Sequence, residues 1–214
     1  MGSTHEVFNQ PEPLVGYNLF AGNRPLQDAL RFNAPALHTA ELAQLGETLG
    51  RADMQAHARL ANVHPPQLIT HDRSGRRVDR VEFHPSYHVL MHLAAHAGLH
   101  GSPWAESATQ PHAHVRRAAG FMLFTELEPS TLCPISMTYA VTPALRGNPA
   151  IAAEWEPMLT KRHYDGRFVA APQKNGVTLG MGMTEKQGGS DVRANTTQAT
   201  PDGSDAWGQR YRLL

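Results

Sequence analysis

The hydrophobic positions in the first three quarters of the chain recur at helical spacing. Leu42, Leu45 and Leu49 fall at i, i+3 and i+7, and Gly50 follows them at a position where helix ends favour glycine. A second apolar series ends before Pro65 and Pro66, which cannot continue a helix. The same criteria predict a helical region from about residue 25 and further helices over 86–99, 110–127, 133–145 and 151–161.

Segments rich in proline, glycine or charge interrupt this helical pattern. Residues 1–24 contain Pro11, Pro13 and Gly16 and predict an extended N-terminal arm. Residues 71–80, centred on Ser74-Gly75, predict a polar turn region.

The pattern changes to short β-type segments near residue 175. Residues 176–181 are apolar, β-branched and flanked by glycine, which favours a strand. A second strand is expected at 196–199, a turn at 201–205 and a third strand over 207–213. Because the last strand runs to Leu214 without a turn or a polar tail, we expect the chain to be the front portion of a longer protein.

These patterns together predict an α+β protein. We expect three parts: the extended arm at 1–24, an all-α helical domain at 25–170, and the first strands of an incomplete antiparallel β-domain at 171–214.

Composition excludes several classes of protein. The 214 residues carry 19 basic and 19 acidic side chains, which argues against a surface built to neutralise many phosphates. The single cysteine, Cys133, cannot form an internal disulfide, so a reducing compartment such as the cytoplasm is favoured. Its apolar neighbours predict that Cys133 is buried. The sequence also lacks a signal peptide pattern and any apolar run long enough for a membrane helix, so no membrane partner is expected.

The segment 182–194 carries the candidate chemistry. Gly188 and Gly189 give a backbone without Cβ atoms that a flat ligand can approach closely and that can adopt positive φ. Thr184 and Ser190 offer hydroxyl groups, and Asp191 is suited to hold its own loop through backbone amides. The residues alone leave two interpretations, a rigid loop that binds a polar planar ligand and an ordinary turn between strands.

This segment resembles the signature of the acyl-CoA dehydrogenase superfamily, in which a small residue, an apolar residue, Ser or Thr, and Glu precede a Gly-Gly or Gly-Ser turn and Asp. The matching positions are Gly182, Met183, Thr184, Glu185, Gly188, Gly189, Ser190, Asp191 and Ala194. Five blocks, of which the last includes most of this segment, resemble the AidB-like branch, bacterial flavoproteins of the alkylation response: residues 7–11, 60–66, 83–85, 132–135 and 181–192.

The resemblance implies FAD as cofactor and the α,β-dehydrogenation of an acyl-CoA or a related substrate. In such enzymes a carboxylate takes the α-proton while the β-hydride moves to the flavin, giving an enoyl-CoA. Thr184 would hydrogen-bond the flavin ring, and Ser190 would contact the cofactor or the acyl thioester. The residues that would line FAD are Met181, Gly182, Met183, Thr184, Glu185, Lys186, Gln187, Gly188, Gly189 and Ser190.

The resemblance places the catalytic base in a C-terminal helical domain, beyond Leu214, so no catalytic residue is expected in this chain. Glu185 is then interpreted as a structural residue of the loop. A homotetramer is implied, and DNA contact is implied only through the C-terminal part. The alternative function is a DNA-associated protective flavoprotein with little dehydrogenase activity, in which this fragment serves folding and oligomerisation.

Two other side-chain groups could be mistaken for sites. Histidines recur every fourth residue from His84 to His100, which is a metal-ligand spacing on a helix. Each step of four residues turns about 40° around the helix axis, so the five rings cannot converge on one ion and no metal site is expected. The arginines of residues 73–80 are interleaved with acidic residues and predict a solvated turn.

Overall fold

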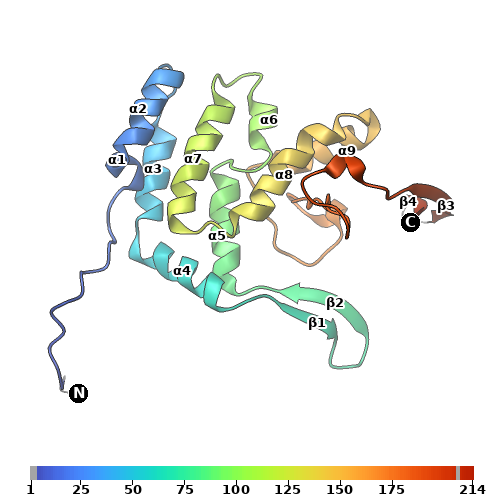
Figure 1. Ribbon diagram of the computed structural model, residues 1–214, viewed down its shortest axis with the longest axis horizontal. Coiled ribbons are helices and arrows are strands. Elements are labelled where there is room, and N and C mark those ends of the chain that lie inside the picture. The colour runs from blue at the N-terminus through green and yellow to red at the C-terminus, as the bar shows by residue number, and fades with distance from the viewer. Residues whose placement is uncertain (1–3, 206–207) are drawn as a thin grey trace. The chain divides into compact units, whose positions relative to one another are not determined.

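The computed structural model describes residues 4–205 and 208–214, and it divides into two compact units, residues 1–180 and 181–214. Unit 1 holds the helices and one β-hairpin, and unit 2 holds an irregular loop followed by a second hairpin (Figure 1). The α+β class is therefore confirmed. None of the helices in the described ranges is long and apolar enough to cross a membrane.

The helices of unit 1 lie close to the positions that the apolar pattern predicts. They begin with the short helix α1, and most of the later ends fall within three residues of expectation. Their bounds are α1 Leu19–Gly22, α2 Arg24–Asn33, α3 Ala40–Leu49, α4 Ala52–Val63, α5 Pro85–His96, α6 Ser102–Glu106, α7 Ala113–Leu127, α8 Leu132–Leu145 and α9 Pro149–Leu159, with a 3₁₀ turn η1 at Ala171–Gln173.

The core of unit 1 forms where these helices pack on one another. Helix α3 packs against α1 and α7, which lie beside it in Figure 1, and α4 packs against α5. The predicted leucines of α3 are all buried, and Leu123 and Phe124 of α7 are fully buried. At Gly46 a Cβ atom would lie 2.5 Å from the backbone nitrogen of Phe20, so glycine permits the close approach of α1 to α3.

One expectation about side-chain burial is wrong, and one helix face is less buried than its apolar spacing suggests. Ala118 and Met122 of α7 share an apolar face with the buried Ala119, yet both are exposed. Cys133 is exposed as well, on the first turn of α8, while the adjacent Leu132 is buried. Both helices carry apolar residues around most of their circumference, so the pattern alone does not select the face that packs.

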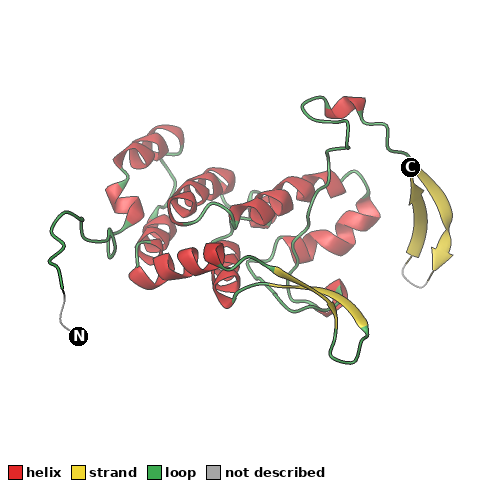
Figure 2. Cartoon of the chain, turned by 60° about the horizontal axis from the view of Figure 1, so that its bottom comes forward, coloured by secondary structure: helices red, strands yellow, loops and turns green. Residues whose placement is uncertain are grey.

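A β-hairpin interrupts the helical region where the sequence predicts only a polar turn. Strand β1 (Gln67–His71) pairs antiparallel with β2 (Arg77–Glu82), and Leu68 lies opposite Val81. The Asp72 carboxylate accepts hydrogen bonds from the amides of Ser74 and Arg76 and so holds the turn. Figure 2 shows this hairpin in yellow, extending from the helices. Most of its residues are exposed on both faces, so it lacks the apolar-polar alternation that marks a half-buried strand.

The strand predicted at 176–181 is wrong, because this extended segment pairs with helices. The amide of Leu179 donates to Thr138 Oγ1 of α8 at 3.1 Å, and the same hydroxyl lies 3.4 Å from the Leu179 carbonyl oxygen. The amide of Val177 donates to the carbonyl of Met158 in α9. A helix hydroxyl thus takes the place of a neighbouring strand, and no ladder forms.

Unit 2 ends in the antiparallel hairpin of β3 (Ala199–Asp205) and β4 (Gly208–Leu213), preceded by a 3₁₀ turn η2 at Val192–Ala194. The predicted strand over 207–213 is confirmed for 208–213, and Trp207 lies outside the described residues. The turn predicted at 201–205 is wrong. Its residues lie within β3, where the register shifts between Pro201 and Ser204 and Gly203 adopts φ +85°, a bulge that accommodates turn-forming residues in a strand.

Candidate functional site

The predicted cofactor loop, Met181 to Ser190, is irregular and lies entirely in unit 2. The amide of Gly188 donates to the carbonyl of Glu185 at 2.9 Å and forms the turn at the centre of the loop. Thr184 and Ser190 are exposed, and neither makes a hydrogen bond to another residue that the structure describes. Their hydroxyls are therefore available to a ligand.

The three glycines of the loop differ in the space around them: Gly182 and Gly189 are open, and Gly188 is tightly packed. A Cβ atom at Gly182 or Gly189 would meet nothing within 4 Å, whereas one at Gly188 would lie 3.2 Å from the amide nitrogen of Glu185. None of the three adopts a positive φ. Gly182 and Gly189 thus provide open space beside the backbone, and Gly188 permits a tight turn. The left-handed backbone conformation that glycine allows is not adopted at these three positions.

The carboxylate of Glu185 is occupied by backbone amides. Oε1 accepts a hydrogen bond from the amide of Thr197 at 2.6 Å, and Oε2 accepts one from the amide of Thr196 at 2.9 Å. Hydrogen bonds from Thr197 and Thr196 lower the pKa of Glu185 to about 2. A carboxylate that binds protons so weakly is a poor general base near neutral pH, which supports a structural interpretation of Glu185.

Asp191 does not hold the loop as its position suggests. It precedes η2, yet its side chain makes no capping hydrogen bond there. Asn195 acts instead, because its Nδ2 donates to the carbonyl of Met183 at 2.9 Å. Sequence reasoning missed the roles of Asn195, Thr196 and Thr197, and the one available signal is that they follow the Gly-Gly-Ser-Asp turn within a few residues.

Unit 1 contains a separate cavity of about 790 Å³, between β2, α5 and residues 163–179. Its aromatic lining includes Tyr87 and Tyr164, and His88 Nδ1 lies 2.8 Å from the Tyr164 hydroxyl. Asp165 and Arg167 on its edge pair with each other. The volume suits a small molecule, but the charged groups of this edge are already paired among themselves.

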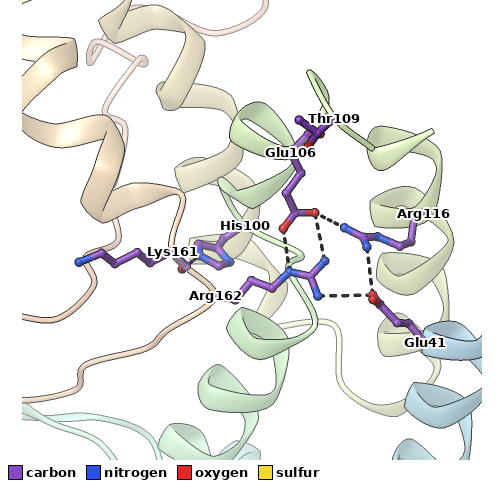
Figure 3. Close-up of polar contacts among 7 residues, drawn as sticks. All are labelled: Glu41, His100, Glu106, Thr109, Arg116, Lys161 and Arg162. Atoms are coloured by element: carbon purple, nitrogen blue, oxygen red, sulfur yellow. Dashed lines mark hydrogen bonds and ion pairs between the residues drawn. The ribbon is translucent and has the colours of Figure 1, made fainter. Parts of the chain in front are cut away.

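A polar cluster of unit 1 joins four charged side chains from separate segments. Glu106 of α6 pairs with Arg116 of α7 and, at 2.7 Å, with Arg162 after α9. Both arginines also reach Glu41 of α3 (Figure 3). Every charge in this group has an opposite partner, so the cluster is suited to joining elements.

The histidine series does not form a metal site. In the described ranges, no three histidine, cysteine, aspartate or glutamate side chains are placed to hold a metal ion. The rings instead have separate environments: His88 contacts Tyr164, His92 stacks on His96, and His100 Nε2 lies 2.6 Å from the carbonyl oxygen of Lys161.

Comparison with known proteins decides the family. The model of the adaptive response protein AidB N-terminal domain matches residues 9–166. The chain belongs to the AidB family. AidB of Escherichia coli (strain K12), provisionally named an acyl-CoA dehydrogenase, is 45% identical over 214 residues, which is 99% of this chain and 38% of that protein. Acyl-CoA dehydrogenase family member 11 of Caenorhabditis elegans is 27% identical over 158 residues, 72% of this chain and 24% of that protein.

Solved structures share the fold of this AidB-family chain. The apo form of Bd2924 matches with a TM-score of 0.79 and 28% identity, covering 97% of this chain and 40% of that one. Caenorhabditis elegans ACDH-11 in complex with C11-CoA matches with a TM-score of 0.74 and 25% identity, covering 100% and 35%. The AidB-like resemblance of the sequence is confirmed, and the chain spans well under half the length of these relatives.

Proposed function

We propose that this chain forms the front part of an FAD-dependent oxidoreductase of the AidB type that dehydrogenates the α,β bond of an acyl-CoA or a related substrate and is linked to the alkylation-damage response. The observation that carries the proposal is the signature loop, in which Thr184 and Ser190 point polar groups outward from a tightly held turn. The relative ACDH-11, which binds C11-CoA, supports an acyl-CoA ligand.

The loop offers the features that a flavin requires. The open space beside Gly182 and Gly189 allows a planar ring to approach the backbone, and the hydroxyls of Thr184 and Ser190 can donate to polar ring atoms. Bound FAD would supply a hydride acceptor. The chain's own contribution is to bind and orient: Met181 to Ser190 line the cofactor, Thr184 tunes the ring by hydrogen bonding, and Ser190 faces the cofactor or the thioester.

The remaining parts of the site are proposed to lie outside residues 1–214, among them the catalytic base and a second flavin-contacting strand. The protein is further proposed to act in the cytoplasm as a homotetramer, with any DNA contact made through its C-terminal part. Residues 1–214 alone should therefore bind FAD weakly.

Titration with FAD tests the proposal on the longer natural protein. We expect Thr184→Val to weaken FAD binding about tenfold, because about 1.4 kcal/mol of hydrogen bonding is lost. Thr200→Val, an exposed threonine of β3 in the same unit, is the matched control and should bind as tightly as the wild type. Flavin fluorescence and co-elution of FAD in gel filtration measure both. Absence of flavin binding in the wild-type protein would overturn the proposed function.

A further inference from the structure

Two side chains tie the signature loop to the residues that follow it, Glu185 from within the loop and Asn195 from its C-terminal side. Glu185 reaches across to residues 196 and 197, where its two oxygens accept the amides of Thr196 and Thr197 at 2.9 and 2.6 Å. Oε2 also lies 3.2 Å from the hydroxyl of Thr196. One carboxylate therefore closes the chain segment from 185 to 197, which contains the Gly-Gly turn and η2.

Asn195 adds a second point of attachment on the other side of Thr184. Its Nδ2 donates to the carbonyl of Met183 at 2.9 Å. Both neighbours of Thr184 are thus bound to residues 195–197. Met183 is bound through its backbone carbonyl, and Glu185 through its side-chain carboxylate. We name these contacts of Glu185 and Asn195 the loop clamp.

The loop clamp leaves the ligand-facing groups untouched. Both oxygens of Glu185 point to the amides of residues 196 and 197, whereas the hydroxyls of Thr184 and Ser190 are exposed and have no hydrogen-bond partner in the described part of the chain. A loop fixed before the ligand arrives loses less conformational entropy when it binds. The arrangement thus separates the carboxylate that holds the loop from the two hydroxyls proposed to hydrogen-bond a ligand.

We propose that Glu185 is a positioning residue, which presets the hydroxyls of Thr184 and Ser190 for the flavin through its hydrogen bonds to Thr196 and Thr197, and that it does not itself contact the reacting atoms. This inference rests on the proposed function for its ligand. The clamp itself is a property of the chain without ligand and can be tested separately.

The variant Glu185→Gln is the sharpest test, because it keeps the size of the side chain and exchanges one acceptor oxygen for an NH₂ group. That group would face a backbone N–H, donor against donor, so one of the two amide hydrogen bonds is lost. The matched control is Glu154→Gln, the same change at an exposed position of α9 for which no ion pair or hydrogen bond is described.

Amide hydrogen exchange, measured by NMR on the longer natural protein without flavin, reports on the clamp directly. We expect the amide that faces the new NH₂ group, that of Thr196 or Thr197, to exchange at least tenfold faster in Glu185→Gln than in the wild type, and both amides to be unchanged in Glu154→Gln. Unchanged exchange at both amides in a folded Glu185→Gln variant would overturn the inference.

Flavin binding then separates the inference from the proposed function. If the wild type binds FAD, Glu185→Gln should raise the Kd about tenfold while Glu154→Gln leaves it unchanged. An unchanged Kd in Glu185→Gln overturns the positioning role although the proposed function stands. A wild type that binds no FAD contradicts the proposed function, while faster exchange at Thr196 or Thr197 would still support the clamp.

A measurement on the unaltered protein covers the case in which the variant does not fold. In ¹³C spectra of the side-chain carboxyl groups, Glu185 should remain ionised at pH 3.5, because its hydrogen bonds favour the charged form. Half-protonation at pH 4 or above, the range of a free glutamate, would overturn the clamp.

Discussion

At the scale of single residues, Glu128 shows how hydrogen bonding keeps a buried carboxylate ionised. Its side chain accepts the amide of Thr131 at 2.7 Å, the amide of Ser130 at 2.8 Å and Asn62 Nδ2 at 3.1 Å, and only 1% of the residue is exposed. Burial raises the pKa of Glu128, but the hydrogen bonds from Thr131, Asn62 and Ser130 lower it by more. We expect Glu128→Gln to reduce the free energy of unfolding by about 1–3 kcal/mol at pH 7, measured by urea denaturation.

The pH dependence of this effect follows from the sign of the shift. Because the folded-state pKa of Glu128 is lowered, its stabilisation is complete above the unfolded-state pKa of about 4.3 and is lost as the pH falls through the folded-state value. The difference between wild type and Glu128→Gln should therefore shrink below about pH 4. Glu47→Gln, an exposed glutamate of α3, serves as control. A difference that stays constant down to pH 3 would contradict the assignment.

Single residues also mark the limit of what the sequence predicts. The spacing of Leu42, Leu45 and Leu49 identifies buried positions because α3 has one apolar face. Cys133 is mispredicted because α8 is apolar on several faces, so its neighbours do not indicate its exposure. The partners of Glu185 lie eleven and twelve residues further along, and only the folded loop brings them to its carboxylate.

At the scale of elements, Glu106 links helices that are too short or too distant to pack extensively. Helix α6 has five residues, and its Glu106 pairs with Arg116 of α7 and Arg162 beyond α9 (Figure 3). Burial raises the pKa of Glu106, and the two arginines lower it by more, so the net shift is downward. Because Glu106→Gln leaves two partly buried guanidinium groups with a weaker partner, we expect it to reduce the free energy of unfolding by about 1–3 kcal/mol.

An exposed ion pair provides the comparison for this network. Asp28 and Arg31 pair within α2, and both side chains are more than half exposed. Asp28→Asn should therefore reduce the free energy of unfolding by less than about 0.5 kcal/mol. Urea denaturation at low and high salt measures both variants. Equal effects of Glu106→Gln and Asp28→Asn would contradict a structural role for the network.

Elements are predicted well where they are self-contained and poorly where they depend on a partner. The helices α3 to α5 and α7 to α9 carry their own hydrogen bonds, and their positions follow from apolar spacing and proline. The segment 176–181 has strand-like residues, yet it lies against Thr138 of α8 and forms no ladder. The hairpin β1–β2 forms despite weak strand signals, because the Asp72 turn joins two segments that pair with each other.

At the scale of the whole molecule, the superfamily is predictable from the signature segment, and the family model and the relatives confirm it. The order of a helical region followed by antiparallel strands is also predictable from the sequence, since it follows from the change of apolar period near residue 175. The geometry of the candidate site was not predictable, because it depends on contacts across the loop from 183 to 197.

Global stability should fall as the pH drops from 7.5 to 5, because His100 is buried in its neutral form. The carbonyl of Lys161 only accepts, so His100 Nε2 donates to it at 2.6 Å, and Nδ1 has no partner among the described residues. Burial lowers the pKa of His100 below its ordinary value, Arg162 lowers it further, and the Lys161 carbonyl and Glu106 raise it by less. Since the unfolded chain takes up this proton at a higher pH than the folded chain, stability is complete above about pH 7 and declines as the pH falls below the unfolded-state value of about 6.5.

The variant His100→Gln isolates this contribution, because its amide can still donate to Lys161 but does not titrate. We expect the wild type to lose about 1 kcal/mol more than His100→Gln between pH 7.5 and 5, measured from urea unfolding curves. His92→Gln, an exposed histidine of α5, should retain the wild-type pH dependence. Protonation of His100 is unfavourable because it adds a buried N–H at Nδ1, beside Arg162 and without an acceptor among the described residues. Equal pH dependence in the wild type and His100→Gln would show that this nitrogen reaches solvent.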